Sequence, residues 1–556
     1  MTNPDGQFFS RRKWLGAASF GSGILGADTA AAQPRQSASP DPGSRVYNIR
    51  DFGAKGDGTT LDTAAVQAAI DACSKDQGGT VLAPAGVFLI GMVELKSNVT
   101  LHVAAGAKLL GSADGKQYHP VDAIPLTGGG SMADGNTGLI YAVNAHNIVI
   151  EGMGTIDGQG AQFRSPSPGV PPPSGIGGSL RPYHLMFYRC ENLTVRDLFL
   201  TSSAFHSVRV CMCKYVKMDG LRIYNRVNGN NDGFHFISCE YVHVSNCDLE
   251  CQDDACALFG SCKFVTVTGC SFSTRWSVFR FGGGEAENIA VSNCIIYDTF
   301  GCPIKMQCSP GSRLENMSFS NLVMRNVTGP IYIGLGSQRP GQSGETAQKP
   351  GIVRNISFNG IHATVIHPVV LPDLSSYPIG EFNPGEIKSC MVLNGTDGYL
   401  ENISFQDVHV AYPGGGTAED AVRDIPLIGG EYFRIGVPPA YGLYARKVRG
   451  LTLNNVRLEV TAPELRPAVV FDDVEDATLS GLSAQGDRKA GSLLRFINAR
   501  QVLLGSPRVL TPTAVFLQVE GASSREISVD GGDLSRAQNP LLFRAGAPQN
   551  SVRLRE

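Results

Sequence analysis

Residues 191–197 read ENLTVRD, and variants of this heptapeptide return along the chain. Many variants place Asn second, and each then alternates apolar with polar residues. Marked by that second residue, the repeat falls at 192, 215, 241, 264, 288, 316, 355, 402, 450, 476, 501 and 526. Most intervals span 23 to 28 residues, and the three longer ones (39, 47 and 48) indicate either an unrecognised copy or a rung that carries a long loop.

The repeat predicts an all-β fold, a parallel β-helix of ten or more rungs. Alternating Val, Ile, Phe and Thr over four to six positions is the pattern of a strand with one buried face. Leucine-rich repeats have a similar period, but Asn and Gly turns with mixed apolar residues favour the β-helix over repeated Leu. The 66 Gly and 32 Pro residues suit a fold with several tight turns in every rung.

The repeats run to the C-terminus without a linker long enough to divide them, so we expect one domain over residues 45–556. Residues 61–72 predict a helix, with Thr60 or Asp62 available as N-cap and an Ala-rich face. Because the end of a solenoid exposes apolar surface, this helix is expected to cap it.

The N-terminus predicts export. Ser10-Arg-Arg-Lys-Trp-Leu15 precedes a Gly- and Ala-rich stretch that ends in Ala30-Ala-Ala32. We interpret residues 1–32 as a twin-arginine signal peptide and 33–44 as a disordered linker, which implies a periplasmic or extracellular protein; a disordered basic tail is the alternative. No other segment reaches the ~18 apolar residues of a membrane span. A net charge of -3 gives no bulk electrostatic reason to bind nucleic acid or anionic membrane.

Fourteen cysteines are present, twelve of them between Cys190 and Cys308, and none forms a CxxC pair. Cys247, Cys270 and Cys294 occupy the same place in successive repeats. This predicts an inward-facing column of small apolar residues rather than a metal site, which needs closely paired ligands. Disulfides after export stay open at this point.

Three carboxylates form a candidate hydrolytic site. Asp232 lies 21 residues before the pair Asp253-Asp254, close to one repeat, so the three should meet on neighbouring rungs. Adjacent Asp residues often mark only a turn. Here the rung around the pair is otherwise apolar, where an uncompensated charge is costly, and catalysis is therefore favoured. His206 and His235 fall near these rungs, and either could supply a ring nitrogen, but we interpret both as structural histidines.

Several blocks resemble glycoside hydrolase family 28, the polygalacturonase-like right-handed parallel β-helices that degrade pectin. They read GGTVLAPAGVFLIGMVELKSNVTLHVAAGAKLLGS from Gly78, GTIDGQG from Gly154, RPYHLMFYRCENLTV from Arg181 and GTAEDAVRDIPLIGGEYFRIGVPPAYGLYARKVRGLTL from Gly416. The resemblance covers nearly all of the chain after the signal peptide. It implies hydrolysis of a pectin-type polysaccharide without a redox cofactor, an organic cofactor or a metal.

The family's catalytic signatures are Asn-x-Asp, Asp-Asp, Gly-His-Gly and Arg-Ile-Lys. The first two are met by Asn230-Asn-Asp232 and by Asp253-Asp254. The third is replaced by Arg275-Trp-Ser-Val278 and the fourth by Pro303-Ile-Lys305. By resemblance, Asp253 is the general acid, whereas Asp232 and Asp254 position and deprotonate water, which gives hydrolysis with inversion.

The resemblance also implies the substrate-binding residues. Asn230 and Lys305 keep their places in the motifs. Arg275 or Arg280 would replace the missing Arg opposite a uronate carboxylate, with a rung-edge residue paired with an acid as the open alternative for either Arg. Three alternatives stay open: a rhamnogalacturonan hydrolase-like activity, a catalytically silent carbohydrate-binding β-helix, and a lyase whose Asp residues hold calcium. The linkage, endo or exo action, the oligomeric state, and whether the insertions 336–350 and 369–387 close one end of the substrate site are not determined by the sequence.

Overall fold

The computed structural model describes residues 44–124, 136–163, 181–337, 349–367 and 388–555. The predicted signal peptide lies outside these residues. So do all of the predicted linker except Ser44 and most of the two insertions singled out above. Within the described residues, no helix is long and apolar enough to cross a membrane.

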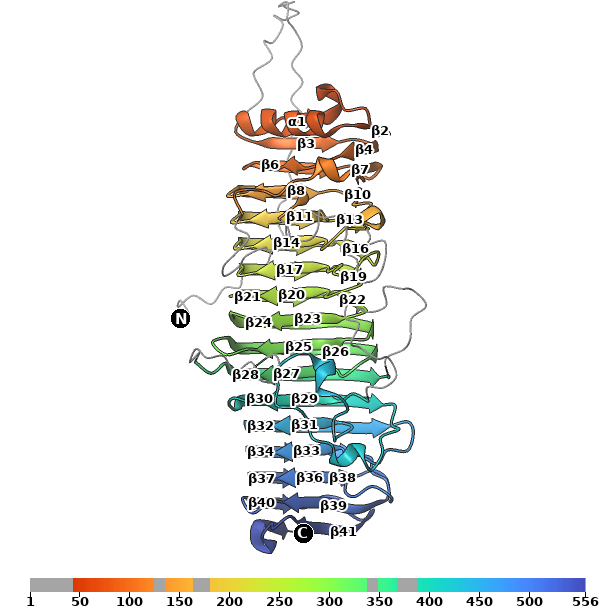
Figure 1. The fold of residues 1–556 in the computed structure, drawn as a ribbon, viewed down its shortest axis with the longest axis vertical. Coiled ribbons are helices and arrows are strands. Elements are labelled where there is room, and N and C mark those ends of the chain that lie inside the picture. Colours follow the sequence, from red (N-terminus) through yellow and green to blue (C-terminus); the bar gives the residue numbers. More distant parts are fainter. Residues whose placement is uncertain (1–43, 125–135, 164–180, 338–348, 368–387, 556) are drawn as a thin grey trace, which may run out of the picture. The chain divides into compact units, whose positions relative to one another are not determined.

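The fold is the predicted parallel β-helix, with rungs stacked from helix α1 to strand β41 (Figure 1). One strand from each rung pairs in parallel with its neighbours in a 15-stranded sheet, here called the front sheet. Its strands are, in order, β5 (Val93–Glu94), β8 (Gly138–Val143), β11 (Tyr183–Tyr188), β14 (Val208–Cys211), β17 (Phe234–Ile237), β20 (Cys256–Phe259), β23 (Ser277–Gly282), β25 (Cys302–Cys308), β27 (Ile331–Leu335), β29 (Met391–Gly395), β31 (Leu443–Arg446), β33 (Val469–Asp472), β36 (Leu494–Ile497), β39 (Thr513–Glu520) and β41 (Ala537–Arg544).

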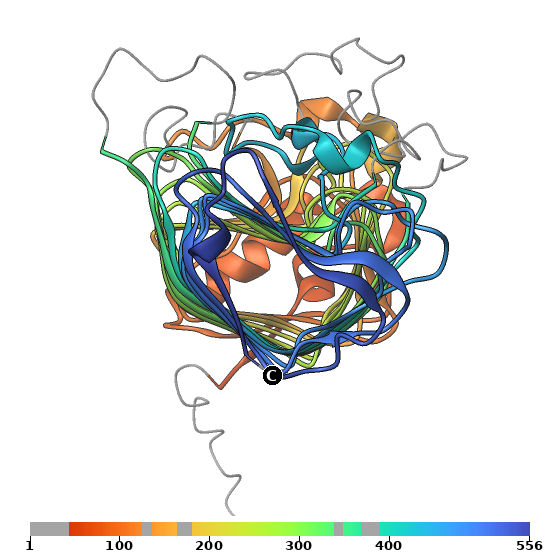
Figure 2. The ribbon, with the colours of Figure 1, turned by 90° about the horizontal axis from the view of Figure 1, so that it is seen from below.

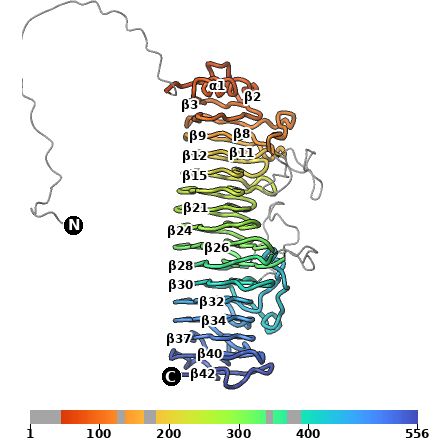
Figure 3. Tube along the Cα trace, turned by 90° about the vertical axis from the view of Figure 1, so that its left-hand side faces the viewer, coloured from red at the N-terminus to blue at the C-terminus, as the bar shows by residue number. Residues whose placement is uncertain are grey.

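The rest of each rung belongs to a 27-stranded sheet. After β14, for example, the chain runs through β15 (Lys214–Asp219) and β16 (Arg222–Asn225) before it returns to the front sheet at β17. In the middle of the stack the two strands merge into one long strand: β24 (Glu285–Thr299), β26 (Arg313–Val327), β28 (Ile352–Val365), β30 (Leu400–Tyr412) and β32 (Val448–Val460). Viewed along the stack, successive rungs superpose around the interior (Figure 2), and from the side their edges lie one above another (Figure 3).

Every one of the twelve repeat positions adopts a left-handed backbone conformation, from φ 52° at Asn402 to φ 73° at Gly450. Asn and Gly tolerate this conformation best, which explains their recurrence. Asn side chains on adjacent rungs also bond to each other, as in Asn355 Nδ2 to Asn316 Oδ1 at 3.0 Å. Three aromatic residues interrupt the Asn column and stack instead, with centroids 5.0 and 4.9 Å apart: Tyr215, Tyr241 and Phe264.

The three long repeat intervals are rungs with long loops and not missed copies. Met317 pairs with Ile356, Ile356 with Ile403, and Ile403 with Leu451, so the repeats at 316, 355, 402 and 450 lie on successive rungs. In the sequence, the extra residues fall between a long strand and a front strand in all three cases. One of these excursions, residues 413–442, is described throughout, and it lies outside the stacked rungs (teal in Figure 2).

Helix α1 (Thr63–Lys75) begins two residues after the predicted start and ends three residues beyond the predicted end. Asp62 is the N-cap residue, but its carboxylate accepts hydrogen bonds from the backbone N–H groups of Lys55 and Gly56, at 2.7 and 2.9 Å, and not from the helix. The helix buries Val66, Ala69, Ile70 and Cys73 at the end of the stack. This is the capping role that the sequence predicted.

All fourteen cysteines lie among the described residues, and all are buried free thiols. Register places Cys247, Cys270 and Cys294 in one column, as predicted. A second column, consisting of Cys190, Cys213, Cys239 and Cys262, precedes the repeat on four successive rungs. Burial raises the pKa of Cys262 to about 12, so this thiol behaves as an apolar residue.

Candidate active site

The three predicted carboxylates lie at the entry to two adjacent front strands. Asp232 precedes β17, and Asp253-Asp254 precede β20. Phe234 pairs with Cys256, and the backbone N–H of Gly233 donates to the Asp254 carbonyl at 3.0 Å. Continued by two residues, this register places Asp232 and Asp254 at equivalent positions of neighbouring rungs. The spacing of one repeat therefore brings the acids together as expected.

All three side chains are buried, with exposed fractions of 4% for Asp232, 7% for Asp253 and 8% for Asp254. Burial, followed by the neighbouring charge of Asp254, raises the pKa of Asp253 to about 7. Burial also raises the pKa of Asp254, but the positive charges of Lys305 and Arg280 oppose that rise. The site thus contains a carboxyl, Asp253, whose raised pKa lets it act as a proton donor near neutral pH, beside two further acids.

Two asparagines before Asp232 have different tasks. Asn231 is buried, and its Oδ1 accepts from the backbone N–H of Asn228 at 2.6 Å while its Nδ2 donates to the carbonyl of Phe205 at 2.7 Å, so it folds the loop. Asn230 is exposed with φ 55°, and its Nδ2 donates to Asp253 Oδ2 at 3.3 Å. The structure therefore places the predicted binding residue Asn230 at the carboxylates.

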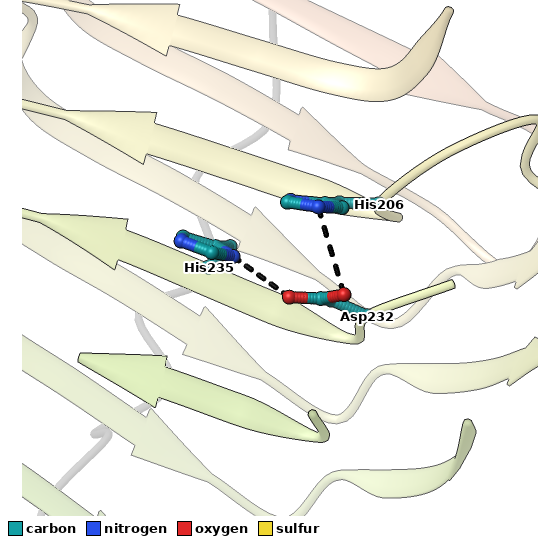
Figure 4. Close-up of side chains that lie close together, drawn as sticks. All are labelled: His206, Asp232 and His235. Atoms are coloured by element: carbon teal, nitrogen blue, oxygen red, sulfur yellow. Dashed lines mark hydrogen bonds and ion pairs between the residues drawn. The ribbon is translucent and has the colours of Figure 1, made fainter. Parts of the chain in front are cut away.

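Two histidines flank Asp232 (Figure 4). Nδ1 of His235 lies 2.7 Å from Asp232 Oδ2, and Nε2 of His206 lies 3.6 Å from Asp232 Oδ1. The imidazole rings stack with centroids 4.5 Å apart. Both residues were interpreted from the sequence as structural histidines, although His235 follows Asp232 by three residues and the register places His206 one rung before it. Both belong to the same cluster as Asp232.

This cluster is also the one group of described residues that could hold a metal ion, since its three donor atoms lie within 4.8 Å of one another. The hydrogen bonds favour a different arrangement. Arg209 Nη1 lies 3.3 Å from His206 Nδ1 and can only donate, so the proton of neutral His206 is on Nε2 and points toward Asp232. Burial and nearby positive charges lower the pKa of both histidines, which keeps them neutral. Two neutral imidazoles therefore stabilise a carboxylate.

Two of the predicted substrate-binding cations are paired within the protein. Arg280 on β23 and Lys305 on β25 are register neighbours. Nη1 of Arg280 lies 2.9 Å from Oε1 of Glu431, and Nζ of Lys305 lies 2.9 Å from Oε2 of the same carboxylate. The Lys305 side chain is 0% exposed. Glu431 was missed by the sequence analysis because it lies 126 residues from Lys305 in an excursion without a repeat signal.

The remaining predicted cation, Arg275, lies in the turn before β23, one rung after Asp253-Asp254, and is half-buried. Its neighbour Trp276 is 3% exposed. The centroid of the Trp276 ring lies 4.4 Å from Nζ of Lys305. The centroids of the Trp276 and Phe433 rings lie 5.6 Å apart. Trp276 therefore packs under the paired cations instead of presenting a free face to a sugar.

The sequence model described as "Glycosyl hydrolases family 28" matches residues 73–373, just over half of the 556-residue chain. The chain belongs to glycoside hydrolase family 28. It is 25% identical over 353 residues to an "Exopolygalacturonase" of Platanus acerifolia, which covers 62% of this chain and 89% of that protein. It is 33% identical over 221 residues to a "Probable polygalacturonase" of Vitis vinifera, a match that spans only 38% of this chain and 43% of the plant protein.

Solved structures confirm the fold of this family 28 chain. An exopolygalacturonase from Thermotoga maritima superposes with a TM-score of 0.56 at 20% identity, over 75% of this chain and 92% of that one. The tailspike protein of E. coli bacteriophage HK620 superposes equally well, with a TM-score of 0.57 at 15% identity, over 91% of this chain and 80% of that one. The β-helix alone therefore does not decide the activity.

As a family 28 member, the chain retains the three acids, but the residues around them differ from the family's catalytic signatures. The turn that should read Gly-His-Gly holds Arg275 and buried Trp276. Imidazoles reach the site from other positions, because His206 and His235 both contact Asp232. The chain is thus a polygalacturonase-like hydrolase by family, with a distinct set of residues around its carboxylates.

Proposed function

We propose that this protein hydrolyses glycosidic bonds in a pectin-type, galacturonate-containing polysaccharide, with inversion at the anomeric carbon. The observation that carries the proposal is the buried Asp253, whose pKa of about 7 leaves it protonated near neutral pH. Asp232 lies on the adjacent rung and accepts a hydrogen bond from His235 as a carboxylate. Inverting glycosidases need this pair, a protonated acid and an ionised base.

In the proposed reaction Asp253 donates its proton to the glycosidic oxygen as the bond from that oxygen to the anomeric carbon breaks. Asp232 and Asp254 hold a water molecule on the opposite face of the sugar and accept its proton as its oxygen attacks the same carbon. One water is consumed, and the two products carry a new hydroxyl at each end of the broken bond. Proton transfer by a placed carboxyl typically contributes about 10²- to 10⁴-fold to a rate.

The hydrolase is favoured over a silent binding protein because nothing in the rung architecture requires three buried acids. Burying a carboxylate costs free energy unless it is paired or hydrogen-bonded. A carboxyl with a pKa near 7 is suited to acid catalysis. It is favoured over a calcium lyase because the oxygens of Asp232 are engaged by two imidazoles, whereas calcium prefers oxygen ligands.

The test is to incubate the protein and its Asp253→Asn variant with homogalacturonan and with rhamnogalacturonan I, in EDTA, and to follow reducing ends and the absorbance of unsaturated products. Reducing ends without unsaturation, abolished in the variant, would support hydrolysis and name the polymer. Unsaturated products would point to elimination, and no release from either polymer would refute the proposal. The anomer released first, read by NMR, tests inversion.

We also propose that the chain is exported by the twin-arginine route. The support is the stretch from Ser10 to Leu15 with the Ala-rich site that ends at Ala32. Changing Arg11 and Arg12 together to Lys should leave full-length precursor in the cytoplasm of a bacterium that has this pathway, while the unchanged chain is processed and exported. Equal export of both chains would overturn the proposal.

A further inference from the structure

Glu431 occupies a position where a substrate carboxylate would be expected. Arg280 and Lys305 project from adjacent front strands as two neighbouring cations, and each approaches one oxygen of the Glu431 carboxylate at 2.9 Å. A uronate that bound these cations would use its two oxygens in the same way. The protein therefore supplies from its own chain the anion that this pair of cations would otherwise take from a sugar.

The two cations of this cluster already have an ionised partner. Burial alone would raise the pKa of Glu431, but the charges of Lys305 and Arg280 lower it to about 2, so Glu431 stays ionised at any pH where the protein works. The same two cations act on Asp254. Glu431 therefore already serves as the ionised partner of both cations, and a free uronate would have to compete with it for them.

Glu431 is also held in place. It begins a short helical turn, Tyr432–Ile435, whose three apolar residues are at most 8% exposed. Phe433 packs on Trp276, with ring centroids 5.6 Å apart. The segment is further tied to the front sheet where Asn394 Nδ2 donates to the carbonyl of Ile428 at 2.8 Å. Swinging Glu431 aside for a substrate would break these contacts.

From these observations we infer that Glu431 determines substrate specificity: the sugar bound beside Asp254, over β23 and β25, is uncharged. Two sources have this chemistry, a neutral sugar within the polymer and a methyl-esterified galacturonate. The inference rests on the proposed function, since it concerns the same site. It makes Glu431 a specificity residue and not a proton donor, because Lys305 and Arg280 engage both of its oxygens.

The experiment compares kcat/KM on galacturonate oligomers of one length, either fully methyl-esterified or fully de-esterified, and on rhamnogalacturonan I oligomers. The unchanged protein should favour the methyl-esterified oligomers, or the rhamnogalacturonan I oligomers with their neutral rhamnose, over the free acid by tenfold or more. Cleavage of the first but not the second would identify a methyl-esterified galacturonate at this position, and the reverse would identify a neutral sugar. In Glu431→Gln, which keeps the side-chain shape but removes the negative charge that pairs with both cations, the preference should move at least tenfold toward the free acid. Glu419→Gln, an exposed site on the same excursion, should leave the ratio unchanged.

Two results would overturn the inference while leaving the hydrolase intact: a preference of the unchanged protein for the free acid, or a ratio that Glu431→Gln does not move. Thermal unfolding of the Gln variant checks that it folds. If no oligomer is cleaved, the proposed function fails separately. The inference is then decided by calorimetry, which measures how tightly the same oligomers bind to Asp253→Asn and to the double variant that also carries Glu431→Gln. Failure of every oligomer to bind would overturn both.

Discussion

Nδ1 of His235 lies 2.7 Å from Oδ2 of Asp232; Asp232 lies two residues before strand β17, and His235 is the second residue of that strand. Neutral imidazole carries one proton, and a carboxylate can only accept, so His235 donates here from Nδ1. Because the donation favours the ionised form of Asp232, it supports the role of that carboxylate in holding and deprotonating water. The rung geometry thus supplies an imidazole to the site without the family's Gly-His-Gly turn.

Replacing His235 should therefore lower kcat with little change in KM. A hydrogen bond to a charged group is worth about 1.5–3 kcal/mol, so His235→Ala should lose roughly 10- to 100-fold in kcat. His235→Asn places an amide N–H near the position of Nδ1 and should recover much of that loss. His243, exposed and bonded to Thr266, is the matched control, and its change to Ala should have no effect. Equal losses in the Ala and Asn variants would mean that the ring acts only through packing.

Asp253→Asn should reduce kcat by about 10²- to 10⁴-fold, because the amide cannot protonate the leaving oxygen. The substitution keeps the acceptor oxygen and the volume, so substrate binding should persist. Asp248→Asn, an exposed carboxylate on the same rung, serves as the control for a simple loss of charge. Retention of more than a tenth of the activity in Asp253→Asn would exclude this residue as the acid.

The pH dependence of kcat/KM should show a basic limb near pH 7. The pKa of Asp253 is raised to about 7, and the reaction requires its protonated form, so the rate should fall as pH rises through that value. Initial rates should be measured between pH 4 and 9 on an uncharged substrate. Because such a substrate does not titrate, the pH dependence then reports the ionisation of the enzyme alone. A plateau that extends to pH 9 would contradict the assignment.

The same shift predicts a pH-dependent cost in stability. The pKa of Asp253 is raised on folding, so between about pH 4 and pH 7 the folded protein still holds a proton that the unfolded chain has lost. The free energy of unfolding therefore falls as the pH rises through this range. Asp253→Asn removes that loss, on the order of 1.4 kcal/mol for each unit of pKa shift. Denaturant midpoints should be similar for both proteins at pH 4 and higher for the variant at pH 8. A variant that is less stable at pH 8 would show that the charged form of Asp253 is stabilised in the fold.

Much of this arrangement was predictable because a β-helix converts sequence spacing directly into spatial neighbourhood. The interval from Asp232 to Asp253-Asp254 placed the acids on adjacent rungs, and the structure has them there. The column of Cys247, Cys270 and Cys294 followed from the same reasoning. In each case residues one repeat apart share a position, so no long-range folding information was needed.

The sequence by itself determined the fold, the family and the three acids, because strand alternation, left-handed Asn turns and repeat spacing are local properties of the chain. Only the tertiary structure decided what surrounds those acids. Glu431 meets Arg280 and Lys305 through an excursion that carries no repeat, and the two histidines meet at Asp232 through the path of a turn. The pairing of charges across such loops depends on where the chain returns to the stack, which spacing along the sequence does not encode.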